Sequence, residues 1–266
     1  MNTKDRLHVE GLEAAYENKT ILKDIQLKVP DGRINVIIGA NACGKSTLLK
    51  AMSRLLKPVG GVTTLDGKAI HTIPPKKLAR TLGLLPQSPI VPEGITVADL
   101  VGRGRFPHQS FMRSRTKEDD HAVAEAMEMM NIADLAERNI DELSGGQRQR
   151  VWIAMALTQE TDILFLDEPT TFLDITYQVE ILDMLTDLNR KQGTTILMVL
   201  HDINLSARYA DYMFALKQGE LVTQGTPQDV ITSEQIKNIF DLDCEVIEDP
   251  VSKSPLIIPK GRHHIR

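Results

Sequence analysis

A glycine-rich segment near the N-terminus has the residue types needed to hold phosphate groups. Residues 39–47 read Gly-Ala-Asn-Ala-Cys-Gly-Lys-Ser-Thr and fit the pattern G-x-x-x-x-G-K-S. Backbone N–H groups of such a loop point at phosphate oxygens, and the N-terminus of the next helix adds positive potential. Lys45 would reach the β- and γ-phosphates of a nucleotide, and the Ser46 hydroxyl would bind Mg²⁺. The predicted nucleotide-binding residues of this loop are Gly39, Ala40, Asn41, Ala42, Cys43, Gly44, Lys45, Ser46 and Thr47.

Two carboxylates follow an apolar run that is typical of a buried strand. The run covers residues 163–166, and Asp167 and Glu168 come directly after it. Ligands of parallel sheets bind at the carboxyl ends of the strands, so both acids would lie at the ligand edge. Asp167 could hold Mg²⁺, and Glu168 could accept a proton from an attacking water as a general base. Two acids at a strand end are often only surface residues, but the phosphate loop favours the catalytic interpretation.

A histidine and a serine–glycine segment add two further candidates. His201 ends the apolar run 194–200 and could donate a hydrogen bond to a γ-phosphate and to the attacking water. A lone histidine after a strand is more often a capping residue, so this role depends on the other motifs. Residues 143–147 read Leu-Ser-Gly-Gly-Gln, with Ser144 at an N-cap position and Gln147 three residues later, as in a capping box. The segment is therefore either an ordinary helix start or a second anion site.

The elements that would position these residues follow from the apolar pattern. Antiparallel strands are expected within residues 6–29, a hairpin over 62–70, and helical structure without strands from 88 to 142. The phosphate loop is expected to lie between a strand at 34–38 and a helix at 46–56, and the Met-containing stripe of a helix at 118–130 is expected to be core packing. Further expectations are helices at 75–80, 132–138 and 233–240, a strand at 82–85, a hairpin between 246 and 258, and a frayed end at 261–266.

Composition is that of an ordinary globular protein. The 266 residues are 42% hydrophobic with a net charge of −5, which gives no overall reason to expect nucleic-acid binding. No apolar run reaches the ~18 residues of a membrane span, and no signal-peptide pattern follows the N-terminus. Cys43 and Cys244 cannot form a disulfide framework or a zinc site alone, so a cytosolic chain is expected.

Residues 103–117 are locally basic, with Phe106, His108 and Phe111 among the arginines. Such a segment could meet nucleic acid or acidic lipid. A solvated loop that faces another protein is the alternative, and the net charge favours it.

Taken together, the order of these motifs resembles that of the ATP-binding-cassette (ABC) ATPases. The phosphate loop, Gln87, Leu-Ser-Gly-Gly-Gln, the Asp167–Glu168 pair and His201 follow one another as in that family, and the resemblance extends from about residue 6 to 230. It implies that Tyr16 stacks on adenine. It also implies that Gln87 ligates Mg²⁺, takes part in catalysis and senses a membrane partner.

The resemblance also implies the fold and the assembly. The fold class would be α/β, a P-loop NTPase core with a mainly parallel sheet flanked by helices, an N-terminal antiparallel β-subdomain and an inserted α-helical subdomain. The ATPase domain would cover 1–240 with the helical insert at about 88–142, and 241–266 would be a short C-terminal extension. Two chains would pair head to tail, so that each covers the ATP of the other with Ser144, Gly145, Gly146 and Gln147.

A finer resemblance points to the ATPase subunits of importers for iron–siderophore complexes, haem and vitamin B12. The sequences that carry it are residues 104–108, 168–175 and 244–250. It implies permease subunits as partners, a substrate-binding protein as an indirect one, no nucleic acid, and a place at the cytoplasmic face of the membrane. Ferric siderophore is the first expectation for the cargo. A soluble ABC ATPase acting on ribosomes or DNA and a module that binds nucleotide without hydrolysis are the alternatives.

The phosphate loop departs from the common family form at two positions, where Ala40 replaces proline and Ala42 replaces glycine. Ala42 would cost about 1–2 kcal/mol if its backbone were left-handed. If that backbone were right-handed or extended, the cost would vanish. Cys43 lies inside the loop, where alkylation or oxidation could block nucleotide binding.

Overall fold

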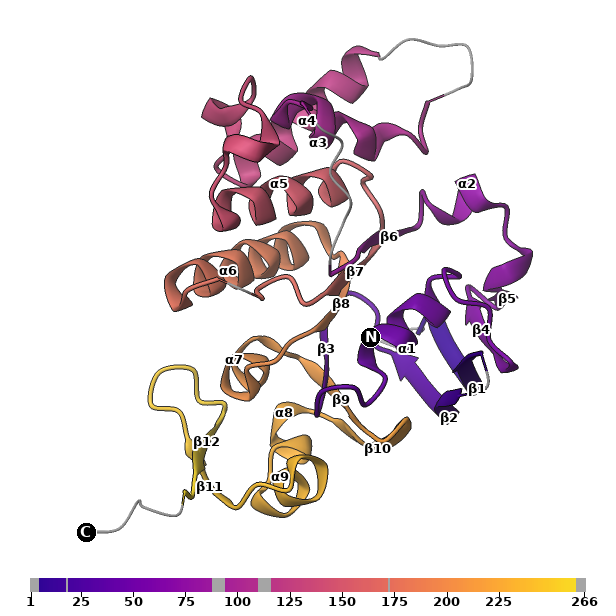
Figure 1. The fold of residues 1–266 in the computed structure, drawn as a ribbon, viewed down its shortest axis with the longest axis vertical. Helices are drawn as coiled ribbons and strands as arrows, with labels where there is room; N and C mark the ends of the chain where they lie inside the picture. Colours follow the sequence, from indigo (N-terminus) through magenta and orange to yellow (C-terminus); the bar gives the residue numbers. More distant parts are fainter. Residues whose placement is uncertain (1–4, 18, 88–93, 110–115, 172, 262–266) are drawn as a thin grey trace. The chain divides into compact units, whose positions relative to one another are not determined.

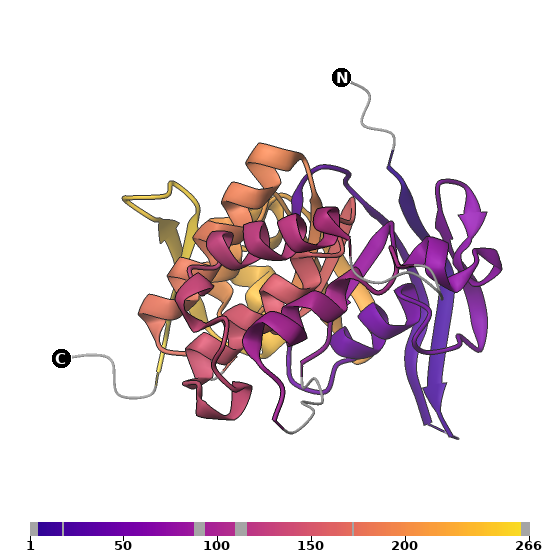
Figure 2. The same cartoon turned by 90° about the horizontal axis from the view of Figure 1, so that it is seen from above.

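The computed structural model describes residues 5–17, 19–87, 94–109, 116–171 and 173–261. They belong to two compact units, and Figures 1 and 2 show the elements of each. Unit 1 combines Met1–Thr72 with Thr195–Arg266, and unit 2 is Ile73–Thr194.

Unit 1 contains an antiparallel sheet in the order β2-β1-β4-β5, whose strands run side by side in Figure 2. Apolar side chains alternate along its two long strands, and this pattern buries one face of the sheet. The strands are β1 (Leu7–Tyr16), β2 (Lys19–Val29), β4 (Gly60–Leu65) and β5 (Lys68–Ala69).

A second group of strands in unit 1 has the order β10-β9-β3-β8. β3 pairs in parallel with β8 and with β9, so Val36 lies between Met198 and Met213. Residues 34–38 are buried throughout, as expected of a strand that is covered on both faces. The strands are β3 (Ile34–Gly39), β8 (Thr195–Val199), β9 (Tyr212–Lys217) and β10 (Glu220–Gly225).

The helices of unit 1 are short, and a C-terminal hairpin packs against one of them. The side-chain amide of Asn204 in α7 donates to the carbonyl of Ile257 and accepts from its N–H, which ties the hairpin to that helix. The elements are α1 (Lys45–Met52), η1 (Ile70–Thr72), α7 (Ile203–Tyr209), α8 (Pro227–Val230), α9 (Ser233–Phe240), β11 (Cys244–Glu248) and β12 (Pro255–Pro259).

Unit 2 contains a parallel pair of buried strands and the longer helices. β6 (Leu82–Leu85) and β7 (Ile163–Asp167) pair residue for residue, with Leu84 opposite Phe165. The helices are α2 (Pro75–Leu78), α3 (Val97–Gly102), η2 (Arg103–Arg105), α4 (Lys117–Met129), η3 (Ala133–Leu135), η4 (Ile140–Glu142), α5 (Gly145–Leu157) and α6 (Ile175–Gln192). Within the described part of the chain, none of the helices has the combined length and apolar character that crossing a bilayer requires.

Most of the expected elements are present. Strands 34–38 and 82–85, the hairpins at 62–70 and 246–258 and the helix 233–240 are confirmed within about two residues. The stripe of α4 is confirmed as core, because Val123, Met127 and Met130 are all buried. Residues 262–266 of the expected frayed end lie outside the described residues.

Two expected helices are shorter than the sequence indicated. α1 ends at Met52 rather than 56, because Arg54 has φ 67° and the N–H groups of Leu55 and Leu56 both bond the carbonyl of Lys50. α2 ends at Leu78 rather than 80.

The helix expected at 132–138 is wrong, and only the 3₁₀ turn η3 forms there. Asn131 has φ 51°, which ends the preceding helix. The carbonyls of Ala136 and Arg138 accept hydrogen bonds from the N–H groups of Ala98 and Val97 at the start of α3. These two carbonyls therefore accept hydrogen bonds from α3 rather than from a helix over 132–138.

Candidate functional site

The phosphate loop of unit 1 joins β3 to α1, and two of its glycines are required by its geometry. Gly39 has φ 149°, and a Cβ there would lie 2.3 Å from the carbonyl oxygen of Leu216 and 2.7 Å from Sγ of Cys43. Gly44 is the N-cap of α1 with φ 109°, and a Cβ there would lie 2.8 Å from Cδ2 of Leu22. The loop can therefore fold back this tightly only because these side chains are absent.

Lys45 opens α1 and is only 5% exposed. Its Nζ donates to the carbonyl oxygens of Gly39, at 2.8 Å, and Ala40, at 3.0 Å. The N-cap of α1 is Gly44, which has no side chain that could cap the helix. The loop thus combines an ammonium group with a helix N-terminus that its N-cap residue leaves without a side-chain cap, which is a donor set suited to phosphate groups.

Gly219 lies in the turn between β9 and β10 and hydrogen-bonds to the phosphate loop. It was not predicted as a site residue. Its N–H donates to the carbonyl of Cys43 at 3.0 Å, and its carbonyl accepts from the N–H of Lys23 at 2.9 Å. A Cβ at this position would lie 2.0 Å from the carbonyl oxygen of Ile21. A glycine after Gln218 is a local signal for a turn, but nothing local in the sequence indicates its contact with the phosphate loop.

The structure gives the backbone conformation of Ala42 and the environment of the Cys43 thiol. Ala42 has φ 60°, so its backbone is left-handed and the cost of about 1–2 kcal/mol applies. Cys43 is buried, and burial raises the pKa of its thiol above the usual value although the nearby charge of Lys45 lowers it. A protonated thiol is a weak nucleophile, so the loop does not activate this cysteine at neutral pH.

Two other predicted residues of unit 1 are accessible. Tyr16 ends β1 and is 44% exposed, as a side chain that stacks on a ligand must be. His201 is exposed and lies between β8 and α7. The cap of α7 is Asp202, whose Oδ1 accepts from the N–H of Leu205 at 2.8 Å. Capping of this helix therefore does not account for His201.

In unit 2, the structure brings Gln87 and Glu168 together. Asp167 ends β7 and is 4% exposed, and Glu168 follows it with φ 57°, an uncommon backbone conformation for a non-glycine residue. Nε2 of Gln87 donates to Oε2 of Glu168 at 2.5 Å. The hydroxyl of Thr171 donates to the same oxygen at 3.0 Å. Thr171 was not among the predicted site residues, and only its place three residues after Glu168 pointed to it.

The capping box predicted before α5 is confirmed. The N–H of Gln147 donates to Oγ of Ser144 at 3.3 Å, and the N–H of Ser144 donates to Oε1 of Gln147 at 3.1 Å. Gly146 is buried, and a Cβ there would touch the ring of Tyr177 at 3.5 Å. Ser144 and Gly145 are exposed, and a Cβ on Gly145 would have no described atom within 4 Å.

Comparison with known proteins decides the family. The model of the family described as ABC transporter matches residues 22–171, which is more than half of the chain. The chain belongs to the ABC transporter family. The predicted fold class is confirmed by the similar solved cassettes. The prediction that the chain is an ATPase is confirmed as well, because ABC ATP-binding proteins are ATPases.

Two relatives of this cassette match it over almost their whole length. The ferric enterobactin transport ATP-binding protein FepC of Escherichia coli (strain K12) is 48% identical over 97% of this chain and 95% of its own. The iron(3+)-hydroxamate import ATP-binding protein FhuC of Bacillus subtilis (strain 168) is 47% identical, over 95% and 94%. Among solved structures, the dimeric bacterial ABC transporter cassette MJ0796 has a TM-score of 0.74 and 27% identity, covering 83% of this chain and 98% of that one.

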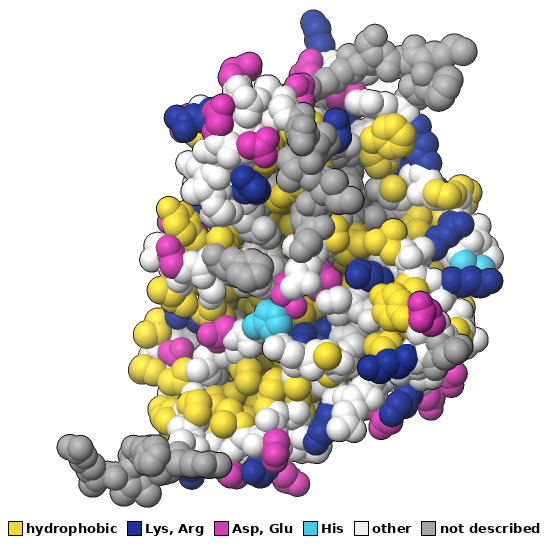
Figure 3. Space-filling model, in the orientation of Figure 1, with side chains coloured by type: hydrophobic (Ala, Val, Ile, Leu, Met, Phe, Trp, Pro, Cys, Tyr) yellow, Lys and Arg dark blue, Asp and Glu magenta, His cyan; other side chains and the backbone are white. Residues whose placement is uncertain are grey.

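At least one arginine of the basic segment 103–117 is buried and makes hydrogen bonds inside the protein. Arg105 is 3% exposed, its Nε donates to Asp119 at 2.9 Å, and Nη1 donates to the carbonyl of Thr158 at 2.8 Å. The N–H of Thr116 and the Arg105 guanidinium lower the pKa of Asp119 to about 2. Residues 110–115 of the segment lie outside the described residues. On the face in Figure 3, Lys and Arg side chains are interspersed with Asp and Glu.

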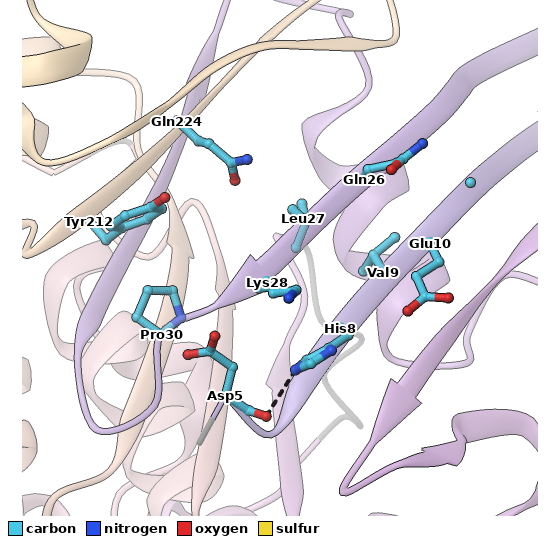
Figure 4. A pocket seen from close by; sticks show the side chains of 11 residues that line it. Asp5, His8, Val9, Glu10, Gln26, Leu27, Lys28, Pro30, Tyr212 and Gln224 are labelled. Carbon is cyan, nitrogen blue, oxygen red and sulfur yellow. Dashed lines mark hydrogen bonds between the residues drawn. The ribbon is translucent and has the colours of Figure 1, made fainter. Parts of the chain in front are cut away.

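A cavity of about 680 Å³ in unit 1 includes none of the predicted site residues (Figure 4). Strands β1, β2, β9 and β10 contribute to its lining, and His8 bonds the carbonyl of Asp5 across part of it at 2.9 Å. Asp5, Glu10 and Lys28 give it charges of both signs. The phosphate loop, with its concentrated N–H and ammonium donors, is therefore the stronger candidate for a nucleotide.

Proposed function

We propose that this cassette binds and hydrolyses ATP to energise the uptake of a ferric siderophore through separate permease subunits. The observation that carries the proposal is the similarity to FepC and FhuC, which extends at 47–48% identity through almost the whole chain. Their names specify ferric enterobactin and iron(3+)-hydroxamate, two ferric chelates. A ferric chelate is accordingly the cargo class that we assign.

In this proposal the phosphate loop binds the triphosphate of ATP. The N–H groups of residues 39–47 and the N-terminus of α1 supply donors, and the ammonium of Lys45 exchanges its bonds with the carbonyls of Gly39 and Ala40 for bonds with phosphate oxygens. Tyr16 is exposed and is assigned to adenine, against which an aromatic ring can stack.

Mg²⁺ fits the oxygen donors that the chain offers. We assign three ligands to the ion: the buried carboxylate of Asp167, the hydroxyl of Ser46 and the amide oxygen of Gln87. Ser46 is the second residue of α1. The ion supplies charge neutralisation for the phosphates when it is bound. The amide nitrogen of Gln87 already donates to Glu168, so this residue can link the metal site to the base.

Hydrolysis then requires a base and a hydrogen-bond donor. Glu168 is assigned to accept the proton of the water that attacks the γ-phosphate, and its Oε2 accepts hydrogen bonds from Gln87 and Thr171. His201 is assigned to donate to the γ-phosphate and the water, a role that its exposed position at the end of β8 permits.

Two copies of the chain are proposed to pair head to tail. Gly145 supports this, because no described atom of the chain crowds this position and nothing within the described chain requires a glycine there. Ser144 and Gly145 are exposed at the start of α5, where they can cover a nucleotide held by the other copy. The dimeric form of the similar MJ0796 cassette agrees with such an assembly.

The remaining partners follow from the importer role. Permease subunits would carry the chelate across the bilayer and would hold this chain at the cytoplasmic face, and a substrate-binding protein would act indirectly. No nucleic acid takes part in this scheme.

The test compares two variants that separate binding from hydrolysis. We expect Glu168→Gln to bind ATP with parental affinity, to form an ATP-dependent dimer, and to lose about 100-fold or more in turnover, because the base is removed. Lys45→Ala should lose ATP affinity itself. Fluorescent-nucleotide titration, size-exclusion chromatography and phosphate release measure the three properties.

Uptake of radiolabelled ferric siderophore then tests the cargo. Cells that lack the chromosomal copy should regain uptake with the parental chain and not with Glu168→Gln. Parental turnover of Glu168→Gln would overturn the base assignment. Unimpaired uptake of ferric siderophores without the chain would overturn the cargo.

A further inference from the structure

Thr171 lies in the short segment that connects β7 to α6, three residues after Glu168. Its hydroxyl donates to Oε2 of Glu168 at 3.0 Å, and its N–H donates to the carbonyl of the same residue at 3.3 Å. Thr171 therefore contacts both the backbone and the carboxylate of the assigned base.

The conformation of Glu168 makes such support useful. Its φ of 57° is uncommon for a residue with a Cβ, and strained residues persist only where their surroundings hold them. The side chain is only partly buried, so packing alone does not fix its rotatable bonds. Hydrogen bonds are then the means by which the direction of the carboxylate is set.

Gln87 and Thr171 both donate to Oε2 of Glu168, and they differ in what else they do. Gln87 lies two residues after the end of β6 and is also assigned to Mg²⁺, so its side chain has a second role besides the contact with Glu168. Thr171 is local to Glu168 and bonds it twice. The threonine is accordingly the donor that can hold the base throughout the reaction.

We propose that Thr171 is a positioning residue for ATP hydrolysis, whose hydroxyl holds the carboxylate of Glu168 in the direction that accepts the proton of water. The inference rests on the proposed role of Glu168 as general base. Thr171 itself exchanges no proton in this scheme, and the proton of the water goes to Glu168.

The role predicts a particular kinetic signature. Thr171→Val keeps the shape of the side chain and removes the hydroxyl, so the phosphate loop and the affinity for ATP are untouched. A small displacement of a catalytic group lowers the rate strongly. We expect kcat to fall about 10- to 30-fold with KM and the ATP dissociation constant within about twofold of the parent, as for loss of an interaction made in the transition state.

Two further variants separate positioning from general destabilisation. Thr171→Ser keeps the hydroxyl and should retain kcat within about threefold. Thr186→Val is the matched control, because Thr186 is also a partly buried threonine of unit 2 whose hydroxyl bonds a carbonyl, that of Leu182 at 2.7 Å. It should leave both turnover and melting temperature close to the parental values.

The deciding experiment is a double-mutant cycle with the full chain, measured as ATP turnover at saturating ATP. If Thr171 acts through Glu168, adding Thr171→Val to Glu168→Gln should lower turnover no further. An equal fold-loss in both backgrounds, parental kcat in Thr171→Val, or a Ser variant as slow as the Val variant would overturn the positioning role. Parental turnover in Glu168→Gln would instead overturn the base assignment, so the two failures are distinguishable.

Discussion

Two helices of this cassette begin at glycine-containing loops, and the two starts are built in opposite ways. At α1, Gly39 and Gly44 are crowded by neighbouring atoms, and the N-cap residue Gly44 offers no side-chain cap. At α5, Ser144 and Gln147 form a complete capping box, whereas Gly145 has open space around its Cα. The start of α1 is crowded by neighbouring atoms but lacks a cap from its N-cap side chain. The start of α5 is capped by side chains but has room at Gly145.

This difference shows which residues the fold of one chain can explain. The glycines of the phosphate loop are necessary for the chain to close on itself, before any ligand is considered. Gly145 is not, since an alanine would fit the described structure and would favour the helix. The proposed approach of a second copy to α5 would account for a glycine there.

The largest effect that tests the comparison is expected from Gly39→Ala. The new Cβ would meet the carbonyl oxygen of Leu216 at 2.3 Å, a backbone atom that cannot rotate away, in a backbone conformation that disfavours a side chain. We expect the free energy of unfolding to fall by about 3 kcal/mol, from overpacking together with backbone strain. Urea denaturation, monitored by circular dichroism, measures it. A loss below about 0.5 kcal/mol would mean that the loop relaxes easily and that Gly39 is not constrained.

Much of this site could be predicted because its signals are local. The run before Gly39, the glycines and Lys45 lie within a dozen residues, and so do Ser144 and Gln147 of the capping box. Local patterns of this kind depend on hydrogen bonds between near neighbours in the chain, so the fold around them adds little.

The contacts that the sequence did not reveal are those that join distant segments. Gly219 bonds Cys43 across 176 positions of numbering, and Arg105 is buried against Thr158 although its surroundings in the sequence are basic. The helix expected at 132–138 failed for the same reason, since the carbonyls of Ala136 and Arg138 bond the start of α3. Each depends on tertiary packing, which periodicity does not encode.

The next effect tests the other half of the comparison. Gly145→Ala should leave the free energy of unfolding unchanged or raise it by up to about 1 kcal/mol, because alanine favours the helix. Turnover should nevertheless fall about tenfold or more, since the added Cβ would meet the phosphates held by the other copy, at a cost of at least ~1.4 kcal/mol in the transition state. ATP affinity of the single chain, measured by titration, is the control and should not change. Parental turnover would show that nothing approaches Gly145 closely.

The smallest effect concerns Ala42, the non-glycine residue of the phosphate loop that has a left-handed backbone. Ala42 is exposed and left-handed, so Ala42→Gly relieves about 1–2 kcal/mol of strain but adds about 0.5–1 kcal/mol of backbone entropy to the unfolded chain. We expect a net gain of about 0.5–1 kcal/mol in the free energy of unfolding. ATP affinity should change less than about threefold, because the loop already has its left-handed conformation with alanine in place. A tenfold gain in affinity by titration would mean that the Cβ of Ala42 obstructs the nucleotide. The phosphate loop at the start of α1 would then be crowded toward its ligand as well as toward the rest of the chain.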